Sequence, residues 1–219
     1  MGNSFTEENY LKAIYKLSIA SNAAASTNQI AAQVNTKAAT VTDMLKKLSE
    51  KKLIIYHKYQ GVTLSDKGRR IAISIVRKHR LWEVFLVEKL NFKWDEVHDI
   101  AEQLEHIKSD ELVDELDKYL GFPKFDPHGD PIPDKNGKIS VLKSMPLAGM
   151  KQKGKYIFTG VEDHSRSFLQ YISKTGISLG DIIQLNEINE YDKSITALVK
   201  NKQVFLSYEA AKNILVEKA

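Results

Sequence analysis

The stretch "AATVTDMLKKLSEKKLIIYHKYQGVTLSDKG", residues 38–68, decides the fold that we predict for the N-terminal part of this chain. Its first half repeats apolar residues at helical spacing, with Val41 and Leu45 on one side. Its second half has the pattern of two short strands around Gly61. A short helix with a hydroxyl cap is expected just before it, over residues 26–34. Two short helices followed by a hairpin predict a winged helix-turn-helix.

The charge distribution favours a nucleic-acid partner for this segment. Residues 1–80 hold 14 Lys and Arg residues and five Asp and Glu residues, a net charge of +9. The remaining residues hold 18 basic and 23 acidic residues, a net charge of −5. A basic module on a mildly acidic body is typical of proteins that bind a polyanion. A chance cluster of solvated lysines is the alternative, and winged folds also serve protein contacts.

The second short helix carries the side chains that we expect to contact DNA. Its small residues would let it enter a major groove closely, and its hydroxyl and amine groups would reach base edges or phosphates. The tip of the hairpin would reach the phosphate backbone or the minor groove. The predicted DNA-binding residues are Lys37, Ala39, Thr40, Thr42, Asp43, Lys58 and Tyr59. Asp43 is unusual near phosphate and could accept a hydrogen bond from a cytosine amino group.

The pattern of the rest of the chain changes from helices to a proline-rich segment and then to short strands. A long helix is expected after Ser65, followed by amphipathic helices over 93–107 and 109–121. Residues 122–138 hold four of the five prolines and predict a linker or an ordered irregular loop. From about residue 141, short β-like runs separated by turns suggest a small antiparallel barrel, and a last helix is expected over "YEAAKNILVEK". The predicted fold is therefore mainly α with a small β domain.

The absence of cysteine restricts the chemistry. It excludes disulfides, thiolate catalysis and cysteine-ligated zinc. Any metal must be held by nitrogen and oxygen ligands, which suit Mn²⁺, Fe²⁺, Co²⁺ and Ni²⁺ as well as Zn²⁺. No apolar run approaches the ~20 residues that a membrane span needs, so we expect a cytoplasmic protein without a membrane partner.

The segment "VHDIAEQLEHI", residues 97–107, carries two histidines and two glutamates that could bind a metal. On a helix, His98, Glu102, Glu105 and His106 would fall within an arc of about 100°, opposite the apolar stripe. A polar face of Glu and His is usually solvated, and this is the simpler interpretation of the segment by itself.

Two further pairs favour the metal interpretation. His79 and Glu83 lie four residues apart on one face of the long helix. Asp126 and His128 lie on the proline-constrained loop. Imidazole and carboxylate groups without sulfur form the ligand set expected for Mn²⁺ or Fe²⁺.

Three segments follow the predicted winged helix: "RKHRLWEVFL" (77–86), "VHDIAEQLEH" (97–106) and "GFPKFDPHGDPIP" (121–133). Together they resemble the diphtheria-toxin-repressor family of metal-dependent transcriptional repressors, and most of all its manganese-transport-regulator branch. The resemblance covers residues 5 to about 135 well and the C-terminal barrel more loosely. It implies a winged helix-turn-helix DNA-binding domain over 1–72, a helical dimerisation and metal-binding domain over 73–140, and an SH3-like β-barrel over 141–219.

The resemblance also implies which residues bind metal. The primary site would consist of Asn9, Glu102, Glu105 and His106. The second site would consist of His79, Glu83, His98, Asp126, His128 and, by a looser match, Asp163. Glu102 stands where iron-type members often have cysteine, and a hard carboxylate there shifts the preference toward Mn²⁺, with Fe²⁺ next.

Two positions on the first helix depart from the family pattern. Asn9 stands where the family usually has Asp or Met, and a neutral amide is a weaker ligand. The neighbouring Glu8 is expected to lie on a different face of the helix. Lys12 stands where some manganese-type members have a further Glu, which argues against a two-metal cluster of that kind.

These features predict a metal-dependent transcriptional repressor of metal-ion homeostasis, which would bind double-stranded operator DNA as a homodimer when loaded with Mn²⁺ or Fe²⁺. We therefore expect that the protein is not an enzyme. One alternative is a metal-dependent hydrolase with His79, His98 and His106 at a catalytic ion, although no constellation of nucleophile and general base stands beside them. The other is a constitutive DNA-binding protein whose His and Glu side chains are solvated.

Overall fold

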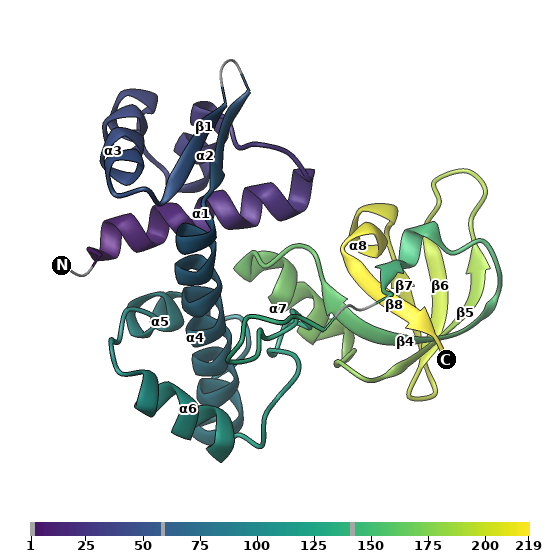
Figure 1. Cartoon of the computed structure of the whole chain (residues 1–219). Coiled ribbons are helices and arrows are strands. Elements are labelled where there is room, and N and C mark those ends of the chain that lie inside the picture. Colours follow the sequence, from purple (N-terminus) through teal and green to yellow (C-terminus); the bar gives the residue numbers. More distant parts are fainter. Residues whose placement is uncertain (1–2, 58–59, 141–142) are drawn as a thin grey trace. The chain divides into compact units, whose positions relative to one another are not determined.

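The computed structural model describes residues 3–57, 60–140 and 143–219, and they form two compact units (Figure 1). The N-terminal unit comprises the chain up to His79 together with residues 102–114 and 133–138. The C-terminal unit comprises residues 80–101, 115–132 and 139–219. Helices α4 (Asp66–Leu90) and α5 (His98–Leu104) each contribute residues to both units.

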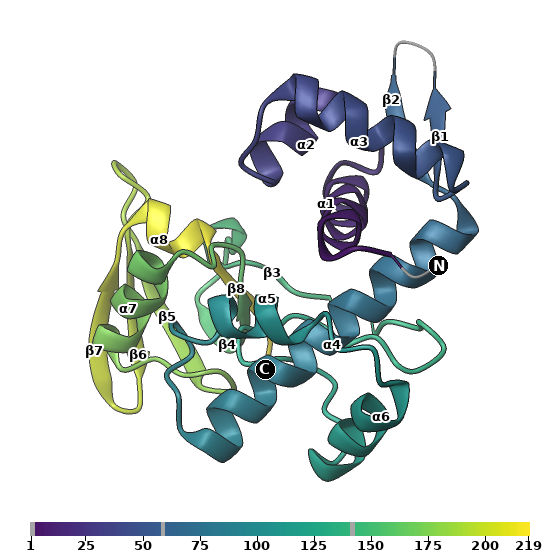
Figure 2. The same cartoon turned by 90° about the vertical axis from the view of Figure 1, so that its left-hand side faces the viewer.

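The N-terminal unit begins with a winged helix-turn-helix, as predicted (Figure 2). Its elements are α1 (Phe5–Ser21), α2 (Thr27–Gln33), α3 (Ala38–Glu50), β1 (Ile54–His57) and β2 (Gly61–Leu64). The strands pair antiparallel, with Ile54 opposite Leu64. Leu11, Ile30 and Leu45 are fully buried and form part of the core of this unit. The predicted contacts Lys58 and Tyr59 lie outside the described residues.

Serine side chains cap the N-termini of three helices, among them the helix for which the sequence predicts a hydroxyl cap. Ser26 accepts the Gln29 backbone N–H and the Gln29 side chain returns to Ser26, a capping box that begins α2. Ser65 Oγ accepts the Gly68 N–H at 3.1 Å and begins α4. Ser109 Oγ accepts an N–H at 3.2 Å in the first turn of α6 (Asp110–Tyr119). Each cap satisfies a backbone donor that the helix itself leaves without a partner.

The helix expected over 93–107 is shorter than predicted. A turn occupies residues 94–96, and α5 ends at Leu104. The Ile107 N–H donates to the Leu104 carbonyl at 3.2 Å, which closes a tighter turn than an α-helix has. The helical angles estimated for Glu105 and His106 therefore do not apply. Both side chains are buried, so the solvated-face interpretation is wrong for this pair.

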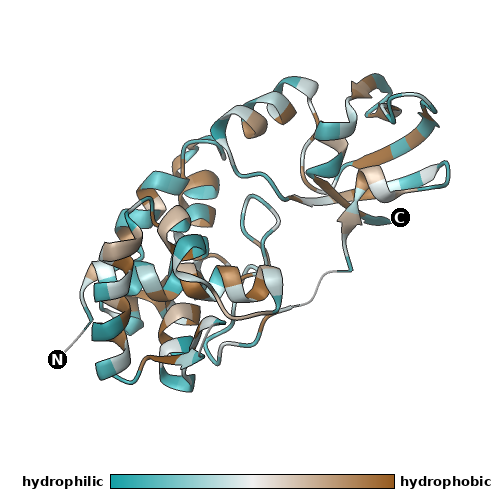
Figure 3. Cartoon of the chain, turned by 90° about the horizontal axis from the view of Figure 1, so that it is seen from above, coloured by the Kyte–Doolittle hydropathy of each residue, from teal (hydrophilic) through white to brown (hydrophobic). Residues whose placement is uncertain are grey.

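The C-terminal unit contains an antiparallel sheet with the strand order β3-β8-β4-β5-β6-β7 among the described residues. The strands are β3 (Met145–Pro146), β4 (Gly154–Val161), β5 (Ile182–Ile188), β6 (Ile195–Val199), β7 (Lys202–Leu206) and β8 (Ile214–Lys218). Figure 3 shows hydrophobic residues along these strands. Phe158, Ile183 and Leu206 are fully buried in the core of the sheet.

Two elements of this unit differ from the prediction. The last helix, α8 (Tyr208–Lys212), is short, and the residues after Asn213 form β8. In β8, Ile214 and Val216 are buried and alternate with more exposed residues, which is the two-residue period of a strand. Helix α7 (Arg166–Thr175) was not predicted, although Ser165 caps it and Gly176 ends it in the left-handed conformation.

We predict that Phe158→Ala lowers the free energy of unfolding by about 3–5 kcal/mol, because it leaves a cavity in a fully buried position. Phe205→Ala is the matched control, since Phe205 lies in the same sheet with 64% of its surface exposed. Its effect should stay within ~0.5 kcal/mol. Urea unfolding of the full chain, followed by circular dichroism, measures both values. Equal losses in the two variants would contradict this packing.

Candidate metal centres and nucleic-acid interface

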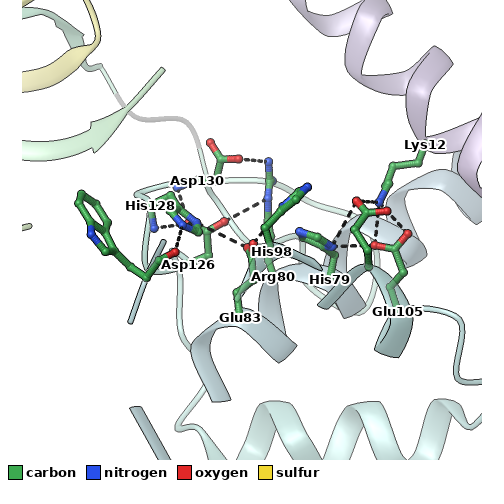
Figure 4. A network of polar contacts seen from close by, with 11 residues as sticks. Lys12, His79, Arg80, Glu83, His98, Glu105, Asp126, His128 and Asp130 are labelled. Atoms are coloured by element: carbon green, nitrogen blue, oxygen red, sulfur yellow. Dashed lines mark hydrogen bonds and ion pairs between the residues drawn. The ribbon is translucent and has the colours of Figure 1, made fainter. Parts of the chain in front are cut away.

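In the N-terminal unit, α1, α4, α5 and the turn after α5 bring six ionisable side chains together, of which Figure 4 labels Lys12, His79 and Glu105. They are Glu8, Lys12, His79, Glu102, Glu105 and His106, and we name them the Lys12 cluster. The Lys12 Nζ donates to both Glu105 carboxylate oxygens, at 2.7 and 2.8 Å, and to Glu102 Oε1 at 2.5 Å. His79 Nδ1 lies 2.7 Å from Glu105 Oε2.

The ammonium of Lys12 fills the place that the resemblance assigns to the primary ion. Ligand atoms of His79, Glu102 and Glu105 lie within 4.8 Å of one another, a spacing that suits a metal. However, all three donors of the ammonium point at oxygens of Glu102 and Glu105. A metal ion on the same oxygens would meet a like charge at contact distance. The residues as arranged therefore do not fit a metal at this site.

The first helix meets His106 through Glu8. His106 Nδ1 lies 2.7 Å from Glu8 Oε2, and it carries the hydrogen because an ionised carboxylate only accepts. The expectation that Glu8 lies on a different face is wrong, since Glu8 and Lys12 are one helical turn apart and face the same cluster. Phe5, three residues before Glu8, stacks on the His106 ring with centroids 4.5 Å apart. Asn9 Oδ1 is buried without a hydrogen-bond partner among the described residues, and its role as a ligand stays a prediction.

The C-terminal unit holds a second group, which we name the Glu83 cluster: Glu83, His98, Asp126 and His128 (Figure 4). Glu83 comes from α4, His98 begins α5, and Asp126 and His128 lie in the loop after α6. Ligand atoms of Glu83, Asp126 and His128 lie within 4.8 Å of one another, and all three residues are buried. His98 Nδ1 lies 3.5 Å from Glu83 Oε1, and His128 Nδ1 lies 3.7 Å from Glu83 Oε2.

Backbone groups hold the side chains of the loop in place. His128 Nε2 donates to the Trp94 carbonyl at 2.8 Å, and since a carbonyl only accepts, the neutral ring keeps its lone pair on Nδ1. The Trp94 ring stacks on the His128 ring with centroids 5.9 Å apart. Asp126 Oδ1 accepts the backbone N–H groups of His128 and Asp130, at 2.8 and 3.0 Å. Nδ1 of His128 and the carboxylate of Asp126 are thereby both directed into the cluster.

The ionisable groups of the Glu83 cluster shift one another's pKa. Burial, reinforced by the charges of Glu83 and Asp130, raises the pKa of the Asp126 carboxyl to about 7. Burial alone would lower the pKa of His128, but the neighbouring Glu83 carboxylate raises it to about 9. Arg80 lies 3.6 Å from Asp126 and donates to Asp130 at 2.7 Å. Nitrogen and oxygen ligands around buried negative charge fit a divalent cation such as Mn²⁺.

The predicted ligand Asp163 has a local role. Its carboxylate accepts the Ser165 N–H at 2.7 Å in the turn before α7. It belongs to none of the candidate metal groups that the described residues form. The ring of the next residue, His164, lies 5.2 Å from the ring of His128.

The DNA-binding residues predicted on α3 are all exposed. Val41, Leu45 and Leu48 turn inward and are fully buried, so the opposite side of the helix faces solvent. The exposed residues are Lys37, Ala39, Thr40, Thr42 and Asp43. Thr42 Oγ1 donates to the Ala38 carbonyl at 3.0 Å, and the Asp43 carboxylate lies 3.8 Å from Lys46 Nζ. This face is available to a groove.

A winged helix with an exposed second helix, in a chain that buries a histidine-carboxylate cluster, defines the class of metal-responsive DNA-binding proteins. Three family models match the chain. They are the iron-dependent repressor N-terminal DNA-binding domain (residues 4–62), the iron-dependent repressor metal-binding and dimerisation domain (65–134), and the FeoA domain (145–218). No described helix has both the length and the apolar character that a membrane span requires.

Three individual relatives show which known proteins the chain resembles. A solved manganese-dependent transcriptional repressor in complex with manganese is 35% identical, with 97% of this chain and 100% of that chain covered and a TM-score of 0.84. The diphtheria toxin repressor of Corynebacterium jeikeium is 30% identical over 68% of this chain and 61% of its own length. A probable metal transport system membrane protein of Chlamydia trachomatis is 43% identical over 42% of this chain and 20% of its own length. This chain thus spans less than two thirds of either curated relative. It belongs to the diphtheria-toxin-repressor family of metal-dependent transcriptional repressors.

The loop that carries His128 depends on a glycine. Gly129 has φ +91°, and a Cβ there would lie 2.1 Å from the Thr159 carbonyl oxygen of β4. The Val161 N–H donates to the His128 carbonyl at 3.0 Å, so the loop is held directly against β4. A side chain at residue 129 would push His128 away from the strand.

We predict that Gly129→Ala lowers the free energy of unfolding by ~3 kcal/mol or more, because strain and a backbone clash add. Gly121→Ala is the matched control: Gly121 also has a positive φ, +76°, but a Cβ there would meet nothing within 4 Å. It should cost only ~1 kcal/mol. Thermal and urea unfolding compare the two variants. Similar losses would contradict the close approach of this loop to β4.

Proposed function

We propose that this chain is a repressor whose affinity for operator DNA rises when a divalent cation, Mn²⁺ first and Fe²⁺ second, binds the Glu83 cluster. One observation carries the proposal: Glu83, Asp126 and His128 are buried with ligand atoms within 4.8 Å of one another. Two buried carboxylates at this distance repel each other, so the arrangement favours a ligand that brings positive charge. The similarity to a repressor solved with manganese supports the same ion.

Each residue of the Glu83 cluster would contribute a ligand to the ion. Glu83 and Asp126 provide carboxylate oxygens, and His128 presents Nδ1 because the Trp94 carbonyl holds its other nitrogen. His98, whose side chain is 48% exposed, provides a ligand from the solvent side. When bound, a divalent cation supplies the positive charge that two buried carboxylates require. The ligands include no sulfur, which favours Mn²⁺ and Fe²⁺ over softer ions.

The exposed face of α3 would read the operator. Lys37 reaches phosphates, while Ala39 and Thr40 allow close approach to base edges. A homodimer would place two such helices on two half-sites of a palindrome. The metal acts on this equilibrium only through a difference in its affinity for the DNA-competent state. The family models name dimerisation and DNA-binding domains, and they support this arrangement.

The proposal gives the protein a regulatory and not a catalytic role. The repressors that it matches are transcription regulators, which fits a non-enzyme better than the alternative metal-dependent hydrolase. We expect a cytoplasmic location, because operator DNA lies there. We also keep the division into a DNA-binding domain over 1–72, a dimerisation and metal-binding domain over 73–140 and an SH3-like barrel over 141–219.

We predict that Mn²⁺ raises the affinity of the metal-free chain for its operator by ~10-fold or more, and that Glu83→Gln abolishes this rise. Glu88→Gln, on the same helix with its side chain 54% exposed, is the control and should respond like the wild type. The measurement is fluorescence anisotropy on a duplex that the protein selects from a random-sequence pool with Mn²⁺. Anaerobic titrations with Fe²⁺ and Zn²⁺ rank the ions. DNA binding that ignores Mn²⁺, or a full response in Glu83→Gln, would contradict the proposal.

A second prediction concerns α3. Lys37→Ala should weaken binding to all duplexes alike, by roughly fivefold, and reduce the salt slope of log K by about 1, because one phosphate contact is lost. Lys151→Ala, an exposed lysine in the C-terminal unit, is the control and should leave both quantities unchanged. Anisotropy measured at several salt concentrations gives the slope. An unchanged slope in Lys37→Ala would remove this lysine from the interface.

A further inference from the structure

Lys12 sets the Lys12 cluster apart from the Glu83 cluster. Both clusters combine carboxylates with imidazoles, and in the first the Lys12 ammonium lies on the carboxylates of Glu102 and Glu105. We infer that Lys12 replaces the primary metal ion as a built-in cation, so that this chain binds one divalent ion, at the Glu83 cluster, instead of two.

The contacts of Lys12 are those of a bound cation. Its side chain is 8% exposed and that of Glu105 is 0% exposed, so the pair is shielded from solvent. All three ammonium donors reach carboxylate oxygens at 2.5 to 2.8 Å, which are short, charge-assisted hydrogen bonds. A buried ion pair persists only when its remaining hydrogen bonds are satisfied, and the His79 Nδ1 contact to Glu105 at 2.7 Å helps to satisfy them.

An incoming divalent ion would have to displace this ammonium. Glu105 has no exposed surface, so separating it from its lysine costs free energy. The apparent affinity of the site for metal is the intrinsic affinity multiplied by the fraction of molecules in which the lysine has left. At the Glu83 cluster, the neighbouring Arg80 directs its closest donors to Asp130 and to the Pro131 carbonyl. We therefore assign the single ion to that cluster, where the ligand atoms of Glu83, Asp126 and His128 lie within 4.8 Å of one another.

With Lys12 in the place of the ion, the connection between α1 and the segment of α5 does not need a metal. Lys12 belongs to α1, whereas Glu102 lies in α5 and Glu105 follows it. Their ion pair joins the first helix of the winged helix-turn-helix to this segment inside the N-terminal unit. The link is complete without metal. The consequence for DNA binding rests on the proposed function: the response to Mn²⁺ passes through the Glu83 cluster alone.

The stoichiometry of Mn²⁺ binding tests the inference on the full-length, metal-free chain without DNA. Electron paramagnetic resonance of free Mn²⁺ should count one ion per wild-type chain and two per Lys12→Met chain, since Met is an unbranched side chain one atom shorter than Lys and carries no charge. Metal-free Lys12→Met should melt roughly 10 °C below the wild type, and Mn²⁺ should recover most of this loss. Co²⁺ spectra should show a new ligand set in this variant only.

Lys51→Met is the matched control. Lys51 pairs at 2.7 Å with Glu7 of α1, the helix that carries Lys12, but it does not belong to the Lys12 cluster. It should bind one ion, like the wild type. If Lys12→Met does not fold, Glu102→Gln decides the question: the inference requires that this variant still bind one ion per chain. A wild-type chain that binds two ions, one of which Glu102→Gln removes, overturns the inference.

The inference and the proposed function fail separately. Two ions per wild-type chain, with DNA binding that rises with Mn²⁺, would refute the role of Lys12 and leave the repressor function intact. One ion per chain, with DNA binding that ignores it, would refute the metal response and support the role of Lys12.

Discussion

A buried carboxylate needs positive charge beside it, and this constraint governs both clusters of the chain. In the N-terminal unit the fixed ammonium of Lys12 meets Glu105, which has no exposed surface. In the C-terminal unit Glu83 and Asp126 are buried beside imidazoles, and Arg80, 3.6 Å from Asp126, directs its closest donors to Asp130 and the Pro131 carbonyl. Burial, together with the charges of Glu83 and Asp130, raises the pKa of Asp126 to about 7. In the first cluster a lysine supplies the positive charge, and in the second we propose that a bound ion supplies it.

The surrounding structure serves to hold the second cluster in place. The Trp94 carbonyl orients His128, two backbone N–H groups orient Asp126, and Gly129 lets the loop lie against β4. These groups are polar backbone atoms at fixed positions, so the geometry does not depend on flexible side chains. Such preorganisation reduces the loss of side-chain freedom when an ion binds. The proline-rich segment is therefore an ordered irregular loop and not a linker.

The sequence predicted the winged helix-turn-helix because its signals are local: apolar spacing on α3, the Ser26 and Ser65 caps and the Gly61 hairpin. The i, i+4 pair of His79 and Glu83, together with the resemblance, predicted the candidate metal ligands. Local sequence patterns could not predict that α5 ends at Leu104 or that β8 is a strand, because packing against other elements decides both. The position of Lys12 on Glu105 depends on residues 93 positions apart, and no local pattern encodes it.

An anomalous difference map of full-length crystals grown with Mn²⁺ tests the central claim most directly, because it locates the ion without reference to DNA. We predict one Mn²⁺ peak per chain, bounded by Glu83, Asp126 and His128, with the Lys12 ammonium still on Glu102 and Glu105. A Mn²⁺ peak between Glu102 and Glu105, with Lys12 displaced, would contradict the account.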